Sequence, residues 1–211
     1  PASGYSSGQA QDTFAKVAEE TLGSSFGFEW TSMAFQEQMA GSSTVVIFAL
    51  AIIVVLMVLA AQYESVTSPI AVIMAVPVAL LGIIIACVIA GRSNDIYTQI
   101  GMVLMIALSA KNAILIVEFA RDYRKEGKSI YDSSLEAGKV RLRPILMTSF
   151  AFILGVLPLV TATGAGAESR VSLGLSVFAG MLMSTLVGTF FIPNFYQFWQ
   201  KIQEKYLEKK K

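Results

Sequence analysis

Hydrophobic and polar positions follow a long-range pattern in which five apolar segments come after a polar opening. Each segment is near or above the ~20 residues that a helix needs to cross a ~30 Å hydrocarbon core. We therefore predict a mainly α, polytopic membrane protein with a five-helix transmembrane bundle at residues 43–199 and a basic tail at 200–211. The predicted spans cover about 43–62, 69–91, 96–120, 144–163 and 171–198.

Residues 1–42 have the pattern of a soluble domain. The segment SSGQAQDTFAKVAEETLG predicts a helix, with Ser7 as its candidate N-cap. The segment FGFEWTS alternates Phe26, Phe28 and Trp30 with smaller or polar residues, which predicts a strand. One helix and one strand cannot form a core, so we expect residues 1–42 to be a short α+β piece of a soluble domain whose partners come from missing sequence or from another chain. The chain begins at Pro1 without a leader pattern, and we expect it to be a piece of a longer protein.

Composition supports the membrane assignment and argues against catalysis. Hydrophobic residues make up 55% of the chain and charged residues 15%, whereas soluble domains carry roughly 25% charged residues. Histidine is absent and Cys87 is the single cysteine, so the commonest metal ligand and any intrachain disulfide are excluded. The sequence also lacks an HExxH motif, a P-loop and paired intramembrane aspartates. We expect no enzyme activity, no cofactor and no metal.

The distribution of lysine and arginine predicts the orientation. Five spans place the link 121–143 and the tail on one side of the membrane, and together they carry twelve cations, against Lys16, Arg92 and Arg170 on the other side. Because cytoplasmic loops carry the excess of Lys and Arg, we expect the C-terminus to be cytoplasmic and residues 1–42 to lie outside.

Lys111 is the main candidate functional residue, because it lies about 15 residues into the third span. A charged side chain at the bilayer centre costs at least ~2.5–3.5 kcal/mol and is therefore usually paired. Glu118 lies two turns away, and every other acid belongs to a loop or to an end of the chain. We expect no carboxylate of this chain within salt-bridge distance of Lys111. The two interpretations are a proton or ion relay and a static ion pair that joins two helices.

Other polar residues near this depth have simpler explanations from the residues alone. Asn112 follows Lys111 directly and points about 100° away, which fits interhelical hydrogen bonding or a separate partner. Arg141 lies at the edge of the fourth span, where cations anchor helices, and Pro144 is expected to begin that helix. Thr148 is more typically bonded to its own helix than to a substrate. In the fifth span, Gly180, Ser184 and Gly188 form a stripe of small residues that predicts close packing.

Three long motifs then carry a family resemblance: ALSAKNAILIVEFARD, RLRPILMTSFAFILGVLPLV and TGAGAESR. They closely resemble the C-terminal end of resistance–nodulation–division (RND) transporters, in the hydrophobe/amphiphile multidrug efflux branch of Gram-negative inner membranes. The preceding spans and the opening segment fit the same family, so the resemblance covers essentially the whole chain. It implies that residues 1–42 are a remnant of a periplasmic porter domain. It implies the eighth to twelfth spans of a twelve-span protomer that assembles as a homotrimer.

The resemblance also implies a mechanism. In such pumps proton flow drives a periplasmic porter domain that expels drugs through an adaptor and an outer-membrane channel. The lysine of SAKNA, here Lys111, pairs with two aspartates on the fourth span, and Thr148 and Arg141 match residues of the proton pathway. The two aspartates have no counterpart in this chain. The expected partners are thus the N-terminal part of the same transporter, the other pump components and the lipid bilayer, without nucleic acid.

Two alternatives stay open at the level of sequence. One is an RND exporter of metal ions or lipids, although the text SAKNAILIVEF favours the drug branch. The other is a non-transporting membrane scaffold or assembly subunit, in which Lys111 is a static ion-pair partner.

Overall fold

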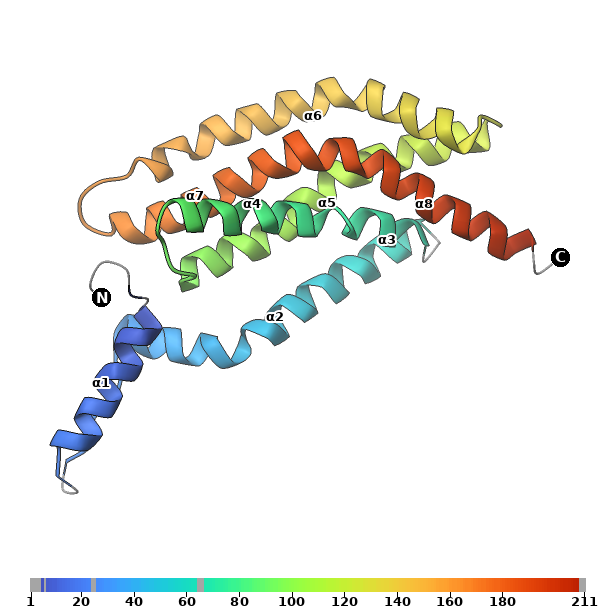
Figure 1. Ribbon diagram of the computed structural model, residues 1–211. Coiled ribbons are helices and arrows are strands. Elements are labelled where there is room, and N and C mark those ends of the chain that lie inside the picture. The colour runs from blue at the N-terminus through green and yellow to red at the C-terminus, as the bar shows by residue number, and fades with distance from the viewer. Residues whose placement is uncertain (1–4, 6, 24–25, 64–66, 209–211) are drawn as a thin grey trace.

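The chain folds into a bundle of long helices in the computed structural model, which describes residues 5, 7–23, 26–63 and 67–208 (Figure 1). Its elements are α1 Ser7–Thr21, α2 Ser32–Tyr63, α3 Thr67–Ile73, α4 Val76–Ile89, α5 Ile96–Lys125, α6 Ile130–Val160, α7 Ala167–Met183, the π-helical turn η1 Ser184–Gly188 and α8 Thr189–Glu208. Helix α2 diverges from the other long helices toward α1, which lies off one end of the bundle.

Within the part of the chain that the structure describes, five helical segments are long and apolar enough to cross a membrane. They correspond to the five predicted spans, and this confirms the mainly α, polytopic fold. The segments are Val45–Gln62, Pro69–Ile89, Ile96–Lys125, Ile130–Val160 and Ala167–Lys205.

The second span consists of two helices, α3 and α4, rather than one. Pro77 lies in the first turn of α4, where it has no N–H to donate and its ring obstructs the carbonyl four residues earlier. The chain therefore makes a turn at Met74 and Ala75, where the Ala75 N–H donates to Val72 O at 3.1 Å. The prediction of one continuous helix for this span did not take Pro77 into account, although a proline at this position indicates a break.

The helix start expected at Pro144 was wrong, because α6 begins at Ile130 and passes through this proline. The start is set by Ser129, whose hydroxyl accepts a hydrogen bond from Asp132 N at 3.0 Å as an N-cap. Pro144 removes one backbone hydrogen bond from the helix, and the turns on either side remain helical. Helix α6 therefore extends from the expected membrane span deep into the charged link.

The strand predicted at FGFEWTS is absent, and residues 26–31 have no regular secondary structure. A strand requires a neighbour for its backbone hydrogen bonds, and the described part of the chain offers none. The alternating aromatic residues instead form a cluster with Phe14 of α1: the rings of Phe14, Phe28 and Trp30 lie 5.4–5.8 Å apart, centroid to centroid. The predicted helix is present as α1, whereas the strand, and with it the α+β character of this segment, is not shown by the structure.

Helix α5 lies at the centre of the bundle and takes part in both of its apolar cores. At one end, Ala113, Ile116 and Val117 of α5 are fully buried with residues of α3, α6 and α8. Toward the other end, Met105 is fully buried with residues of α4, α6 and α7. A displacement of α5 would therefore alter the packing of every helix from α3 to α8.

Small residues allow α7 to approach its neighbours closely, as the sequence predicted for Gly180. A Cβ atom at Gly180 would lie 2.8 Å from Met105 Cγ and 3.0 Å from Ile83 Cγ1, both shorter than ordinary contacts. At Gly188 the nearest atom would be 3.6 Å away and belongs to Ser184. The close packing predicted for this stripe thus occurs at Gly180 and not at Gly188.

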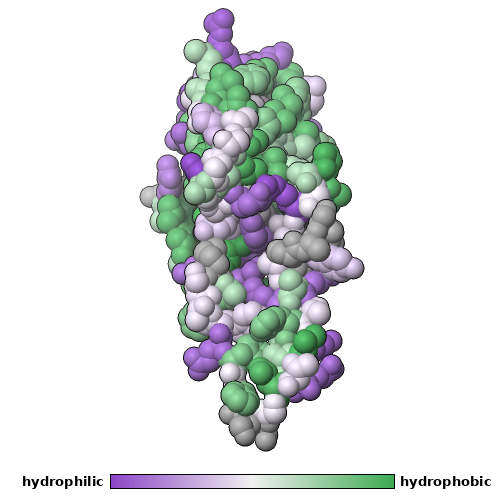
Figure 2. Space-filling view, turned by 90° about the vertical axis from the view of Figure 1, so that its left-hand side faces the viewer, coloured by the Kyte–Doolittle hydropathy of each residue, from purple (hydrophilic) through white to green (hydrophobic). Residues whose placement is uncertain are grey.

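Ion pairs show which connections share an end of the bundle. Arg92, after α4, contacts Glu168 at 2.9 Å and donates to Ser172 Oγ at 3.0 Å, which joins the α4–α5 connection to the first turns of α7. Arg124 and Glu204 join the end of α5 to α8 at the opposite end. The charged link and the C-terminal tail therefore lie together at what we call the basic end. Figure 2 shows the other end, where hydrophilic residues are mixed with hydrophobic ones.

Candidate functional site

Lys111 projects from the exposed side of α5, in the middle of an apolar span. Its ammonium has no ion pair with any residue that the structure describes, and Glu118 has none either. This confirms, for the described residues, the expectation that the chain supplies no carboxylate for Lys111. A cation at this depth with no partner at hand is the feature that defines the candidate site.

The residues around Lys111 explain why it is held on the exposed side. Helix α5 begins at Asp95, whose side chain accepts from Thr98 N at 2.7 Å as an N-cap. Ala110 and Ala113 are buried in one of the two cores, which fixes the rotation of the helix about its axis. Because successive residues differ by about 100° around a helix, Lys111 emerges beside this buried face.

Asn112 lies on the buried side of α5, with 4% of its surface exposed. Its amide Nδ2 has no hydrogen-bond partner among the described residues. An unpaired buried amide is costly, and most buried polar groups in proteins are paired. The predicted interhelical hydrogen bond of Asn112 is thus not found for its amide Nδ2 among the described residues.

Arg141 of α6 packs over an aromatic ring of α5, with its guanidinium carbon 3.5 Å from the ring centroid of Phe119. The Nε atom is buried and unpaired within the described residues. This cation–π contact favours a fixed position for the guanidinium. The role of Phe119 was missed, because the contact depends on how α5 and α6 pack and leaves no signal in the sequence.

Thr148 of α6 is exposed, and its hydroxyl lies 3.1 Å from both the Pro144 and the Ile145 carbonyl oxygens. This is the local backbone bonding expected of a threonine in a helix. Helices α5 and α6 run antiparallel, and Arg141 lies level with Phe119. Seven residues further along α6, Thr148 is therefore close to the depth of Lys111. Arg141 is about two turns nearer the basic end.

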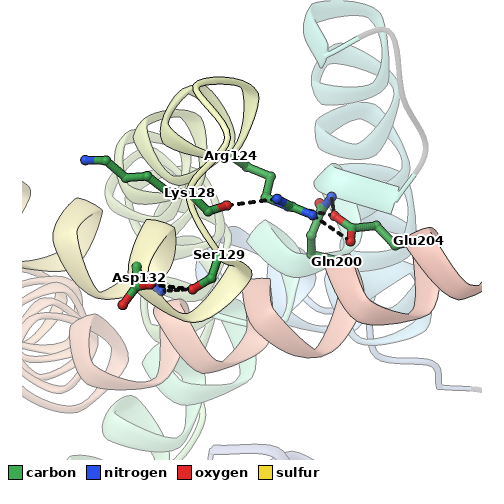
Figure 3. Close-up of polar contacts among 6 residues, drawn as sticks. All are labelled: Arg124, Lys128, Ser129, Asp132, Gln200 and Glu204. Atoms are coloured by element: carbon green, nitrogen blue, oxygen red, sulfur yellow. Dashed lines mark hydrogen bonds and ion pairs between the residues drawn. The ribbon is translucent and has the colours of Figure 1, made fainter.

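Side chains at the basic end fix the end of α5 to α8 (Figure 3). Arg124 donates from Nε to Glu204 Oε1 at 2.9 Å and from a terminal nitrogen to Oε2 at 3.0 Å, in the two-pronged geometry typical of arginine. Arg124 also donates to the carbonyl of Lys128 at 2.8 Å. A hydrogen bond to Glu136 raises the pKa of the Lys128 ammonium. These contacts stabilise the C-terminal end of α5, the helix that carries Lys111.

We expect Glu204→Gln to lower the free energy of unfolding only slightly, by about 1 kcal/mol or less, because both partners are one-third exposed. The thermal midpoint of the purified protein measures this effect. The matched control is Asp122→Asn, which breaks a more exposed i,i+3 pair with Lys125 and should have a smaller effect. A larger effect of the control would contradict the role of Arg124–Glu204 as the main ionic contact at this end.

No group of three or more Cys, Asp or Glu side chains that could hold a metal ion occurs within the described ranges. The candidate site consists of Lys111, with Thr148 at a similar depth in the membrane and Arg141 about two helical turns nearer the basic end. No hydrogen bond between these three side chains is found in the described part of the protein. Lys111 and Thr148 are both open toward the outside of the bundle.

Comparisons with known proteins place this arrangement in a family. The sequence profile described as the AcrB/AcrD/AcrF family matches residues 1–200. The chain is 47% identical to the toluene efflux pump membrane transporter TtgB of Pseudomonas putida over 93% of its length, and 44% identical to the multidrug export protein AcrF of Escherichia coli over 92%. It is 43% identical over its whole length to the solvent-resistant pump membrane transporter SrpB of Pseudomonas putida. These alignments cover about a fifth of the relatives' own length.

The fold and the site define a multi-pass α-helical membrane protein with an intramembrane cation. The extent of the family match identifies it more closely. The chain belongs to the AcrB/AcrD/AcrF family of RND efflux transporters. It corresponds to one part of such a transporter.

Proposed function

We propose that the chain is part of an inner-membrane pump that exports drugs and amphiphiles in exchange for protons, with Lys111 in the proton relay. The observation that carries this proposal is the exposed Lys111 in the middle of a span, which has no ion pair with the residues that the structure describes. A cation in the hydrocarbon region costs at least ~2.5–3.5 kcal/mol, so a counter-charge must come from outside the described residues. The remaining N-terminal part of the transporter, with its acidic fourth span, supplies it.

The relay works by changing the attraction between Lys111 and those acids. While the carboxylates are ionised, they hold the ammonium in an ion pair, which is strong where water is scarce. A proton that binds to a carboxylate removes this attraction and releases the lysine. Because α5 contributes to both apolar cores, its displacement is transmitted to the helices packed around it.

Thr148 and Arg141 serve the same pathway in different ways. The exposed hydroxyl of Thr148, near the depth of Lys111, can exchange its local backbone bond for one to water or to an acid. Arg141 is held against Phe119 and keeps a positive charge on the route between the basic end and Lys111. Asn112 contributes an amide on the buried side of α5, unpaired among the described residues, and is the weakest member of the set.

The names of the relatives support the drug branch. These names describe the efflux of toluene, the export of multiple drugs and resistance to solvents. The metal- or lipid-exporter alternative has no comparable support. We propose further that the basic end is cytoplasmic, that the transporter is a homotrimer, and that it works with a periplasmic adaptor and an outer-membrane channel.

Reconstitution of the whole transporter into liposomes tests the coupling. We expect a fluorescent amphiphilic dye to move against the direction of an imposed proton gradient, and a protonophore to stop this movement. Dye transport that does not depend on the gradient would contradict antiport. Correctly assembled protein that moves no dye at all would favour the scaffold alternative.

A further inference from the structure

A groove of about 320 Å³ lies between α6 and α8 near the basic end and has no assigned role. Its apolar wall includes Leu135, Leu142 and Phe190. The two helices come close at its floor, because a Cβ at Gly138 would be 3.4 Å from Pro193 Cγ. This approach leaves room above the helix contact for an elongated apolar group.

The polar residues of the groove gather toward the basic end. Lys139, Asn194 and Gln197 line it together, and Lys139 is exposed. Leu142 of α6 and Thr189 of α8 lie about one turn further into the bilayer. Thr189 also lines the groove, and its buried hydroxyl has no hydrogen-bond partner among the residues described. From Lys139 to Leu142 and Phe190, the lining thus changes from cationic to apolar in the direction of the membrane interior.

The positive charge of Lys139 is not neutralised by nearby acids. Glu136, one turn earlier on α6, is hydrogen-bonded to Lys128, and Asp132 accepts from Ser129 at 2.6 Å. Lys139 has no ion pair in the described part of the chain. An uncompensated cation at the mouth of an apolar groove is complementary to an anion that carries hydrocarbon chains.

The groove also faces away from the proposed relay. Lys139 and Arg141 differ by two positions, which places them about 160° apart around α6. Arg141 packs against α5, whereas Lys139 lies on the side of α6 that borders the groove with α8. If the rest of the transporter covers the Lys111 side, the groove remains open to lipid.

We propose that this groove binds an anionic phospholipid of the leaflet at the basic end, with the lipid phosphate at Lys139 and an acyl chain along Leu142 and Phe190. Phosphate and acyl chain occur in a phospholipid in the same order as the cationic and apolar residues of the groove. Basic pockets between transmembrane helices are known to recognise anionic head groups. The proposal requires only the membrane orientation and does not depend on Lys111 or on proton coupling.

Native mass spectrometry of the delipidated whole transporter tests this proposal, with phosphatidylglycerol and phosphatidylcholine added in turn. We expect Lys139→Gln to weaken phosphatidylglycerol binding about fivefold, the effect of one cation near the surface, and to leave phosphatidylcholine binding unchanged. The matched control is Lys205→Gln, an exposed lysine of α8 outside the groove, which should bind like the parent protein. Equal binding by the Lys139 and Lys205 variants would overturn the assignment.

A photo-crosslinker at Leu135, which is 39% exposed in the groove, identifies the occupant directly. In native membranes we expect a phospholipid adduct. A cross-link to another segment of the transporter would overturn the proposal, because it would show that protein covers the groove. Neither measurement involves transport, so the proposal can fail while the proposed pump function stands.

Discussion

Lys111→Ala is expected to reduce proton-driven dye efflux by the whole transporter about 100-fold or more, the scale at which loss of a proton-transfer group acts. Without the ammonium, carboxylates that face it lose the charge that stabilises their ionised form. They then remain protonated and cannot complete a cycle. Because Lys111 is exposed and lies outside the packed cores, the variant should still fold and assemble.

A relay and a static ion pair predict different results for Lys111→Arg. Arginine keeps the positive charge but stays protonated under all physiological conditions. A static pair between two helices would tolerate this change, so efflux near the parent rate would support the scaffold interpretation. In the proposed relay the cation must be released when a carboxylate is protonated, and the planar guanidinium binds carboxylates in a more persistent two-pronged geometry than an ammonium does. We therefore expect the Lys111→Arg variant to export dye well below the parent rate.

The measurements are dye efflux in cells and gel filtration of the purified variants. The matched control is Lys205→Ala, which removes an exposed lysine near the end of α8 and should leave both unchanged. Full efflux by Lys111→Ala would exclude the relay. Loss of efflux together with loss of assembly would show that Lys111 is a structural ion-pair partner and would contradict the proposed role.

The membrane helices were predictable because their signal is local and strong. An apolar run of about 20 residues has few alternatives in a membrane, whatever surrounds it. The lack of an ion-pair partner for Lys111 among the described residues was predictable for a related reason: the acids of the chain lie outside the apolar spans or too far along α5. Both predictions depend on distance along the sequence, and neither requires knowledge of packing.

The errors occurred where the structure depends on contacts that the sequence does not show. The alternation of Phe26, Phe28 and Trp30 is typical of a strand, but the rings of Phe28 and Trp30 can equally pack on Phe14 when no partner strand is present. Pro144 resembles a helix start only when the cap at Ser129 is overlooked. The cation–π contact of Arg141 requires that α6 lie beside Phe119, which only the fold reveals.

Gly174→Ala is expected to destabilise the transporter, because this glycine is where α7 comes closest to α6. An added Cβ would lie 2.7 Å from Leu159 Cβ, 2.9 Å from Val160 N and 3.0 Å from the Leu159 carbonyl carbon. Two of these atoms belong to the backbone and cannot move aside by a side-chain rotation. Overpacking of this kind costs about 1–3 kcal/mol, so the thermal midpoint of the purified transporter should fall.

The same substitution at Gly155 of α6 is the matched control, because a Cβ there would meet no atom within 4 Å. Alanine favours the helix over glycine by about 1 kcal/mol, so Gly155→Ala should leave the midpoint unchanged or raise it. Gly180→Ala should lie between the two, since the Met105 and Ile83 atoms that it meets belong to side chains that can adjust. Equal effects at Gly174 and Gly155 would contradict the close α6–α7 contact, because helix propensity alone would then account for both.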